Sequence, residues 1–249
     1  MQKPTSTTLE TRRLGPVAVA MMTQDQALGT IVRHVVENTP LNVAFANTNL
    51  VMQAHRNPDV AANLSDFLVL NDGIGLELGC RMVHGQGFPD NLNGTDFTPR
   101  LLQNLPKGTK VFLYGSKPHV VAKAQSVVEK TCGVTVVGVQ DGYAAVRDED
   151  LCQRINASGA QVVLVATGNP RQEAWMARNR AALQAPVCVG VGALLDFMTG
   201  EFKRAPAWVQ KAKLEWLYRL MQEPTRLARR YTLDVLDFLW VCRKYGASA

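Results

Sequence analysis

The sequence predicts an α/β fold in which parallel sheets and crossover helices form two lobes, followed by a helical C-terminal appendage. Short apolar runs rich in Val, Leu and Ala alternate with stretches of helical periodicity. Most of these runs end in Gly, Asn or Asp, which is typical of a strand that turns into a helix. After Gly200 the alternation stops, and the chain has the pattern of successive helices, broken at Pro224.

Six apolar runs are the predicted strands. A strand that is covered on both faces of a parallel sheet is apolar throughout, so it shows no alternation. The runs are Leu41–Ala46, Phe67–Leu70, Lys110–Tyr114, Val134–Val139, Val162–Ala166 and Val187–Val191.

Five helices are predicted between these strands. They are Gln24–Glu37, Thr95–Gln103, His119–Lys130, Asp148–Ala157 and Arg171–Leu183. Repeated strand, turn and helix indicate a parallel sheet with crossover helices. The Pro106-Lys107-Gly108 break divides the chain into an N-terminal lobe (1–105), a second lobe (106–200) and the appendage (201–249).

The positive charge of the chain is concentrated at its end. Residues 200–249 contain ten Lys/Arg and five Asp/Glu, whereas residues 1–199 contain seventeen and sixteen. Apolar residues recur there at helical spacing: Leu227, Tyr231, Val235, Phe238 and Cys242. A basic, amphipathic helix of this kind fits a membrane surface, but a helix packed on the domain has the same apolar face. Both interpretations remain open from the sequence.

The composition is that of a globular protein, with 47% hydrophobic and 19% charged residues. The five cysteines are scattered without a Cys-x-x-Cys pair, which favours reduced, cytoplasmic thiols. We expect neither a secretory signal nor a membrane-spanning helix, because no apolar stretch has the required length.

Polar residues and glycines follow the predicted strands, at the edge where an open α/β sheet binds ligands. A glycine there lets a phosphate approach backbone N–H groups at a helix N-terminus, and Gly115, Gly168 and Gly192 are placed for this. Tight turns alone would also require glycines. Neither a Walker P-loop nor the full dinucleotide fingerprint is present, since Gly-Val-Gly at 190–192 lacks the third glycine.

Asp72 is the best candidate for chemistry, because it follows a strand and precedes a glycine. In a cleft it could accept a proton from a hydroxyl nucleophile. An aspartate that only caps the next helix would show the same pattern.

Several other chemistries lack their motifs. There is no His-Glu-x-x-His sequence and no paired Cys/His spacing, so we expect no metal site. No Gly-x-Ser-x-Gly elbow is present either. If the ligand carries phosphate, the appendage arginines could supply the charge, because guanidinium binds phosphate oxygens in a bidentate way.

A series of sequence blocks occurs in order along most of the chain. They are NTN at 47–49, NDGIGLELGCR at 71–81, NGTDF at 93–97, FLYGSKP at 112–118, GVQDGY at 138–143, GNPRQEAW at 168–175, VGVGALLDFMTG at 189–200, RAPAW at 204–208 and LEWLYRLMQEPTRLARR at 214–230. Through these blocks the chain resembles the bacterial WecG/TagA/CpsF glycosyltransferases of family 26, and most of all their exopolysaccharide branch of the xanthan β-1,4-glucosyltransferase type.

The resemblance implies Rossmann-like lobes and an inverting, metal-independent transfer of a sugar from a UDP-sugar to a polyprenyl-diphosphate-linked sugar. The donor is then a substrate, and no cofactor is needed. Asp72 matches the catalytic base, and Gln172 matches an amide near the donor sugar. Arg219, Arg226 and Arg229 match appendage arginines over the diphosphate, which would neutralise charge on the leaving UDP.

The remaining site residues are predicted from their places in these blocks. Asn47 and Asn49 join the catalytic group. The expected donor-binding residues are Gly115, Asp141, Gly142, Tyr143, Gly168, Gln172, Glu173, Gly192 and Asp196. The resemblance also implies a peripheral enzyme on the cytoplasmic face of the bacterial cell membrane, held there by the appendage, with a homo-oligomer left open.

Two residues depart from the family pattern. Asn47 stands where many members have threonine, and Asn91 stands where members have an arginine before the NGTDF block. The loss of that arginine argues against an anionic uronic acid donor. The ANTNLV and LNGTDF segments look most like the exopolysaccharide branch, and this resemblance implies UDP-glucose and a β-1,4 bond in exopolysaccharide synthesis. The alternatives are UDP-N-acetylmannosamine and UDP-N-acetylmannosaminuronic acid, for a teichoic acid linkage unit or enterobacterial common antigen.

Two further hypotheses belong to other classes of protein. The departures at Asn47 and Asn91 would also fit a regulator that binds a nucleotide sugar without catalysis. A basic tail could bind nucleic acid, with strongly salt-dependent affinity. We do not expect nucleic-acid binding, because Trp208, Trp216 and Trp240 occur within apolar helical stretches.

Overall fold

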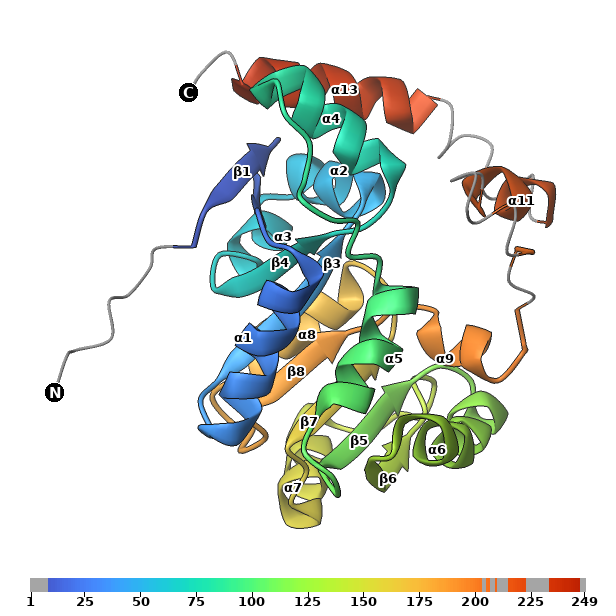
Figure 1. The fold of residues 1–249 in the computed structure, drawn as a ribbon. Coiled ribbons are helices and arrows are strands. Elements are labelled where there is room, and N and C mark those ends of the chain that lie inside the picture. Colours follow the sequence, from blue (N-terminus) through green and yellow to red (C-terminus); the bar gives the residue numbers. More distant parts are fainter. Residues whose placement is uncertain (1–8, 203–204, 207–208, 210–214, 223–232, 247–249) are drawn as a thin grey trace, which may run out of the picture.

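The computed structural model describes residues 9–202, 205–206, 209, 215–222 and 233–246. Its centre is a six-stranded sheet in the order β4-β3-β8-β7-β5-β6, and every neighbouring pair in it is parallel (Figure 1). The strands are β3 (Leu41–Ala46), β4 (Phe67–Asn71), β5 (Lys110–Gly115), β6 (Thr135–Gln140), β7 (Val162–Ala166) and β8 (Val187–Gly190). All six predicted strands are therefore confirmed, with ends within one residue of the expected ones.

The two expected lobes share this one sheet instead of having separate sheets. The β8 strand pairs with β3 on one side, through Leu41↔Val187, and with β7 on the other, through Val162↔Val187. A strand from the second half of the chain thus joins the two halves, which the order of the strands in the sequence does not reveal. The expectation of two sheets was wrong, and the Pro106 region connects two parts of a single α/β layer structure.

Helices cover both faces of the sheet. One face packs against α1 (Gln24–Val36), α5 (Gly94–Asn104), α6 (Pro118–Cys132) and α9 (Leu194–Met198). The other face packs against α2 (Thr48–Arg56), α3 (Pro58–Asn63), α4 (Ile74–His84), α7 (Asp148–Ser158) and α8 (Arg171–Asn179). Figure 1 shows α1 and α5 in front of the strands and α8 behind them. The structure confirms the five predicted helices, although α8 ends at Asn179, before the predicted Leu183.

The middle strands show why the runs are apolar throughout. All of β7 is buried. Its Val162 and Leu164 face the cluster under α1 and α5, while Val163 and Val165 face the cluster under α7 and α8. Burial on both faces needs an apolar residue at every position.

The last described helix, α13 (Leu233–Gly246), packs on the domain. It contacts α2, α4 and the hairpin of β1 (Thr11–Leu14) and β2 (Val17–Ala20). Phe238 and Cys242, two residues of the predicted apolar face, are fully buried there. These two residues are therefore part of the core, whereas Val235, the third described residue of that face, is half-buried. Leu236 and Trp240 of the same helix are exposed. Leu227 and Tyr231 lie outside the described residues.

The order of the elements creates crevices at the carboxyl ends of the strands. After β3 and β7 the chain enters helices on one face, whereas after β5 and β8 it enters helices on the other. Adjacent strands whose helices diverge leave a gap between them, and this is where α/β sheets bind ligands. Among the described residues, no helix combines the length and apolar character needed to cross a bilayer.

Candidate active site

A cavity of about 360 Å³ opens at the carboxyl ends of β3, β4, β7 and β8. It is lined by polar side chains, glycines and three phenylalanines. Predicted site residues in its wall are Asn47, Asn49, Asp72, Gly168, Gln172 and Gly192; the wall is completed by Phe45, Gly94, Thr95, Thr167, Asn169, Arg171, Gly190, Val191, Ala193, Phe197 and Phe202. We call it the first cavity.

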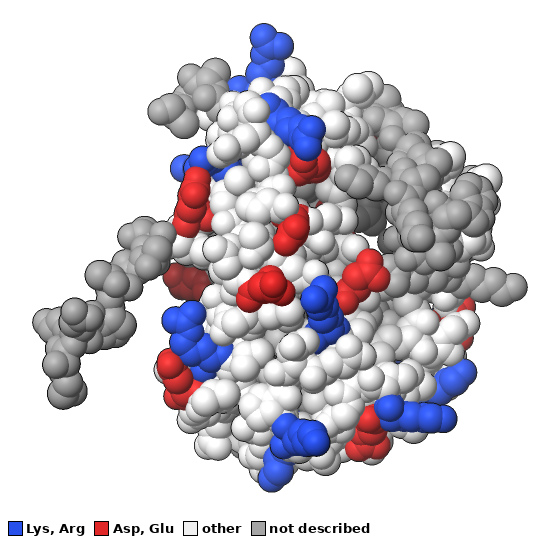
Figure 2. All heavy atoms as spheres, viewed as in Figure 1, with Lys and Arg blue, Asp and Glu red and all other residues white. Residues whose placement is uncertain are grey.

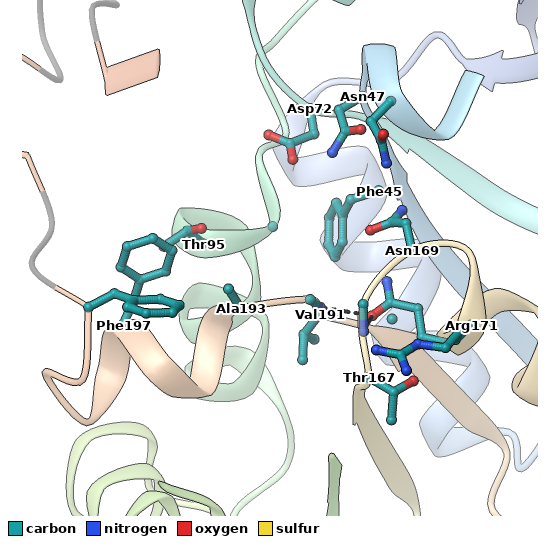
Figure 3. A pocket seen from close by; sticks show the side chains of 17 residues that line it. Phe45, Asn47, Asp72, Thr95, Thr167, Asn169, Arg171, Val191, Ala193 and Phe197 are labelled. Carbon is teal, nitrogen blue, oxygen red and sulfur yellow. Dashed lines mark hydrogen bonds between the residues drawn. The ribbon is translucent and has the colours of Figure 1, made fainter. Parts of the chain in front are cut away.

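Asp72 stands at the end of β4, held there by its own backbone. Its N–H donates a 2.7 Å hydrogen bond to the carbonyl of Ala46, which extends the β3–β4 ladder by one residue. The next N–H, of Gly73, donates to Oδ1 of Asn91 at 3.2 Å. Gly73 has φ +91°, a conformation that favours glycine. The carboxylate lies beside Asn47 in the first cavity (Figure 3).

Asn47 both lines the first cavity and caps α2. Its Oδ1 accepts a 3.1 Å hydrogen bond from the N–H of Leu50. The side chain is thus held by the helix that it starts. Asn49, in the first turn of α2, lines the same wall.

Gln172 connects two cavity loops. Its Oε1 accepts hydrogen bonds from the N–H of Gly168, at 3.2 Å, and from the N–H of Gly192, at 3.0 Å. These glycines follow β7 and β8, so one amide fixes the spacing of two strand ends. Gln172 lines the first cavity, but its oxygen is engaged by the protein and the residue is 1% exposed. Its proximity to the donor sugar stays a prediction.

Glu173 lies behind this wall and does not line either cavity. Its Oε1 accepts hydrogen bonds from Nε2 of Gln172 and Nδ2 of Asn169, while Oε2 is buried without a partner among the described residues. Burial raises the pKa of this carboxyl to about 7. The contact of Glu173 with the donor stays a prediction, and in this structure its carboxyl group is buried behind the cavity wall.

A second cavity, of about 340 Å³, lies at the carboxyl ends of β5 and β7. Tyr114 and Trp175 form an aromatic wall, with ring centroids 4.9 Å apart. Of the predicted residues, Gly142 and Tyr143 line it, and Tyr143 is 74% exposed. Thr167 and Arg171 line both cavities, so the two adjoin at these residues.

The sequence did not point to Asp148, which organises the second cavity. Its carboxylate accepts hydrogen bonds from Nε1 of Trp175, from the Arg178 guanidinium and from Nδ2 of Asn179. Burial raises its pKa, but these hydrogen bonds outweigh burial and hold the pKa below its usual value. Asp148 begins an Asp-Glu-Asp sequence, a signal that would have drawn attention to it, and Asp150 is bound by Arg147 at 2.8 Å.

Besides Glu173, three more of the predicted donor-binding residues line neither cavity. A Cβ on Gly115 would lie 2.4 Å from the carbonyl carbon of Ala166, so the close approach of two strand ends requires this glycine. Oδ1 of Asp141 accepts the N–H groups of Tyr143 and Ala144 and shapes their turn. Asp196 accepts a 3.0 Å hydrogen bond from Oγ of Ser116, which does line the second cavity.

The predicted appendage arginines are not placed by the structure. Arg219 belongs to α11 (Glu215–Gln222), but its side chain is outside what the structure describes. Arg226 and Arg229 lie outside the described residues. Their proximity to either cavity stays a prediction.

Positive charges line the first cavity together with the Asp72 carboxylate. The helices α2, α4, α5 and α8 begin beside it, and helix N-termini carry partial positive charge. Arg171 adds a full charge. On the face drawn in Figure 2, described basic and acidic side chains are interspersed. Within the described ranges, no three His, Cys, Asp or Glu side chains come together to hold a metal ion.

A comparison with known protein families agrees with these features. The model of the glycosyl transferase WecG/TagA/CpsF family matches residues 12–249. The match includes every residue that lines the two cavities.

Proposed function

Because the chain belongs to the WecG/TagA/CpsF family of glycosyl transferases, we propose that the first cavity is where it transfers the sugar, with Asp72 as the base. The family makes the chain a transferase that uses a nucleotide-sugar donor and a lipid-linked acceptor. One observation carries the assignment: Asp72 lines a polar cavity that adjoins a second, aromatic-walled cavity.

In the proposed reaction the acceptor hydroxyl lies beside Asp72. Its oxygen attacks the anomeric carbon of the donor sugar while its proton passes to the Asp72 carboxylate. The bond between the anomeric carbon and the diphosphate breaks, and its electron pair leaves with UDP. Attack from the face opposite the diphosphate inverts the anomeric centre.

The donor spans the two cavities in this proposal. The sugar occupies the first cavity, between Gly168, Gly192 and Asp72. The nucleoside occupies the second cavity, where Tyr114, Tyr143 and Trp175 offer aromatic surfaces. Gln172 acts from behind by holding the Gly168 and Gly192 loops in place.

We propose glucose as the transferred sugar, in a β-1,4 bond of a lipid-linked exopolysaccharide precursor. Asn91 supports a neutral donor, because it stands in place of an arginine and its Oδ1 is engaged by the Gly73 N–H. UDP-N-acetylmannosamine and UDP-N-acetylmannosaminuronic acid remain the alternative donors.

We also propose that the enzyme works on the cytoplasmic surface of the membrane, where its polyprenyl-linked acceptor resides. The basic appendage and the exposed Leu236 and Trp240 on α13 support this placement. Lys244 lies 5.4 Å from the Trp240 ring, so a cation and an aromatic residue are presented together.

The test is a panel of UDP-sugars with a prenyl-diphosphate-glucose acceptor, assayed for UDP release and lipid-linked product. We expect turnover with UDP-glucose and little with the two N-acetylmannosamine donors. Turnover with one of those donors instead would change the sugar and keep the reaction. Binding of UDP-sugars without turnover on prenyl-linked acceptors would favour a non-catalytic regulator.

A further inference from the structure

Arg171 occupies the border between the two cavities. It is the first residue of α8, and it lines both the first and the second cavity. Only Thr167 shares this position. In Figure 3, Arg171 lies beside Thr167, at the other end of the labelled cluster from Asp72 and Asn47.

The charges around the cavities single out this arginine. Arg178 is the other arginine among the described residues of the two walls, and its guanidinium is paired with Asp148 at 2.8 Å. The Arg171 side chain makes no hydrogen bond or ion pair with the described part of the chain, and the residue is exposed. An arginine side chain that borders two cavities and has no partner among the described residues can offer its donors to a ligand.

We propose that Arg171 binds the diphosphate of the nucleotide-sugar donor and stabilises the negative charge that develops on the leaving UDP. This inference rests on the proposed function, because it takes the sugar to lie in the first cavity and the nucleoside in the second. The diphosphate joins these two groups, so it must pass the border that Arg171 and Thr167 form.

The chemistry of the step places charge at this border. As the acceptor oxygen bonds to the anomeric carbon, the bond from that carbon to the β-phosphate oxygen breaks, and its electron pair stays on that oxygen. The guanidinium can bind two phosphate oxygens at once. A cation at the leaving oxygen and a base at the attacking oxygen belong at opposite ends of the reacting centre, as Arg171 and Asp72 are arranged.

The backbone around Arg171 suits the same ligand. Arg171 is the first residue of α8, so the partial positive charge of the helix N-terminus adds to the charge of its guanidinium. Gly168, three residues earlier, has φ +79°, and a Cβ there would meet no atom within 4 Å, so the space beside it is open. These features would leave room for phosphate oxygens near the helix start.

The test compares Arg171→Gln and Arg171→Lys with the wild-type full chain. Calorimetry with uridine, UMP and UDP separates the base from the two phosphates, and steady-state kinetics with the active UDP-sugar gives kcat and KM. Arg33→Gln is the matched control, since Arg33 is an exposed arginine in the last turn of α1 and lines neither cavity.

We expect Arg171→Gln to bind UDP at least about tenfold more weakly, with uridine binding unchanged and UMP between them. Its kcat/KM should fall about 100-fold, the scale seen when a charge-stabilising donor is removed. Arg171→Lys should recover part of the loss, because it keeps the charge without the bidentate fork. Arg33→Gln should behave as wild type.

Equal loss of uridine and UDP affinity in Arg171→Gln would overturn the proposal, as would UDP binding and turnover within twofold of wild type. If Arg171→Gln fails to fold, Arg171→Lys is compared with wild type in its place, and a smaller loss of UDP affinity with unchanged uridine affinity is expected. A wild-type chain that binds no UDP or UDP-sugar would contradict the proposed function itself. If instead the wild type binds UDP and Arg171→Gln binds it equally well, only the role of Arg171 is contradicted.

Discussion

Nε2 of Gln172 donates a 2.8 Å hydrogen bond to Oε1 of the buried Glu173, and this contact orients the Gln172 amide. With Nε2 turned to Glu173, Oε1 faces the N–H groups of Gly168 and Gly192. Glu173 thereby acts on the first cavity through Gln172. Gln172 and Glu173 are therefore positioning residues. Their hydrogen bonds explain why an amide and an acid follow each other at the start of α8.

Glu173→Gln should remove a pH dependence of stability. The pKa of this carboxyl is about 7 in the folded protein, against 4.5 for an ordinary glutamate. Between these values the folded chain keeps a proton that the unfolded chain has released. The free energy of unfolding therefore falls as pH rises from about 4.5 to 7, by about 3 kcal/mol in total.

Urea unfolding at pH 5 and pH 8 measures this effect. The wild type should lose stability relative to Glu173→Gln between the two values, with the two proteins most alike at pH 5. Glu37→Gln, at an exposed position after α1, is the control. Equal pH dependence in wild type and Glu173→Gln would show that Glu173 does not keep its proton.

The packing of α13 on α4 can be tested at Gly79 and Phe238. A Cβ on Gly79 would lie 2.8 Å from Cε1 and Cζ of Phe238, so Gly79→Ala should destabilise by about 1–3 kcal/mol. Phe238→Leu removes those ring atoms and relieves the clash. The double variant should therefore lose less than the sum of the single losses, by about 1 kcal/mol or more.

Urea unfolding of the four proteins gives this coupling. Gly29→Ala is a matched control, because Gly29 is in the α1 helix and a Cβ there would meet no atom within 4 Å. It should stabilise by about 0.5–1 kcal/mol. Additive effects of Gly79→Ala and Phe238→Leu would mean that α13 does not rest on α4 as described.

Asp148→Asn should lower the free energy of unfolding, because Asp148 holds together residues in the wall of the second cavity. It removes the ion pair with Arg178 and one acceptor oxygen, at a cost of about 1–2 kcal/mol near neutral pH. Since the folded pKa of Asp148 is lowered, its stabilisation is present above the unfolded pKa and is lost as pH falls through the folded one. The stability gap between wild type and variant should narrow from pH 6 to pH 3.

Asp150→Asn is the comparison for this measurement. Asp150 pairs with Arg147, but both side chains are largely exposed, so its loss should change stability less than the loss of Asp148 does. A gap for Asp148→Asn that stays constant with pH, or equal effects of the two variants, would contradict the role given to Asp148.

The sequence predicted the strands well because each is buried on both faces and is apolar throughout. It did not predict α4, in which Gly75 and Gly79 suggest turns. Both glycines are packing sites: a Cβ would meet Thr48 at Gly75 and Phe238 at Gly79. Such long-range contacts are invisible in local periodicity, as is the pairing of β8 with β3 that joins the lobes.

For the site, the rule that ligands bind beyond the strand ends predicted Asp72, Asn47, Gly168 and Gly192 as site residues. The structure places all four in the wall of one cavity. The rule does not say which side chains point inward. The Glu173 side chain points into the protein. Arg171, two positions earlier, lines both cavities. On a helix, residues two positions apart face different directions, and only the packing of α8 decides which one meets the ligand.

Turnover by Asp72→Asn, measured with the active UDP-sugar and the prenyl-linked acceptor, tests the central claim most directly. The amide keeps the shape of the side chain but cannot accept the hydroxyl proton. We predict a fall in kcat of about 100-fold or more, with UDP binding and unfolding free energy close to wild type. A variant that retains turnover within a few-fold of wild type would contradict Asp72 as the base.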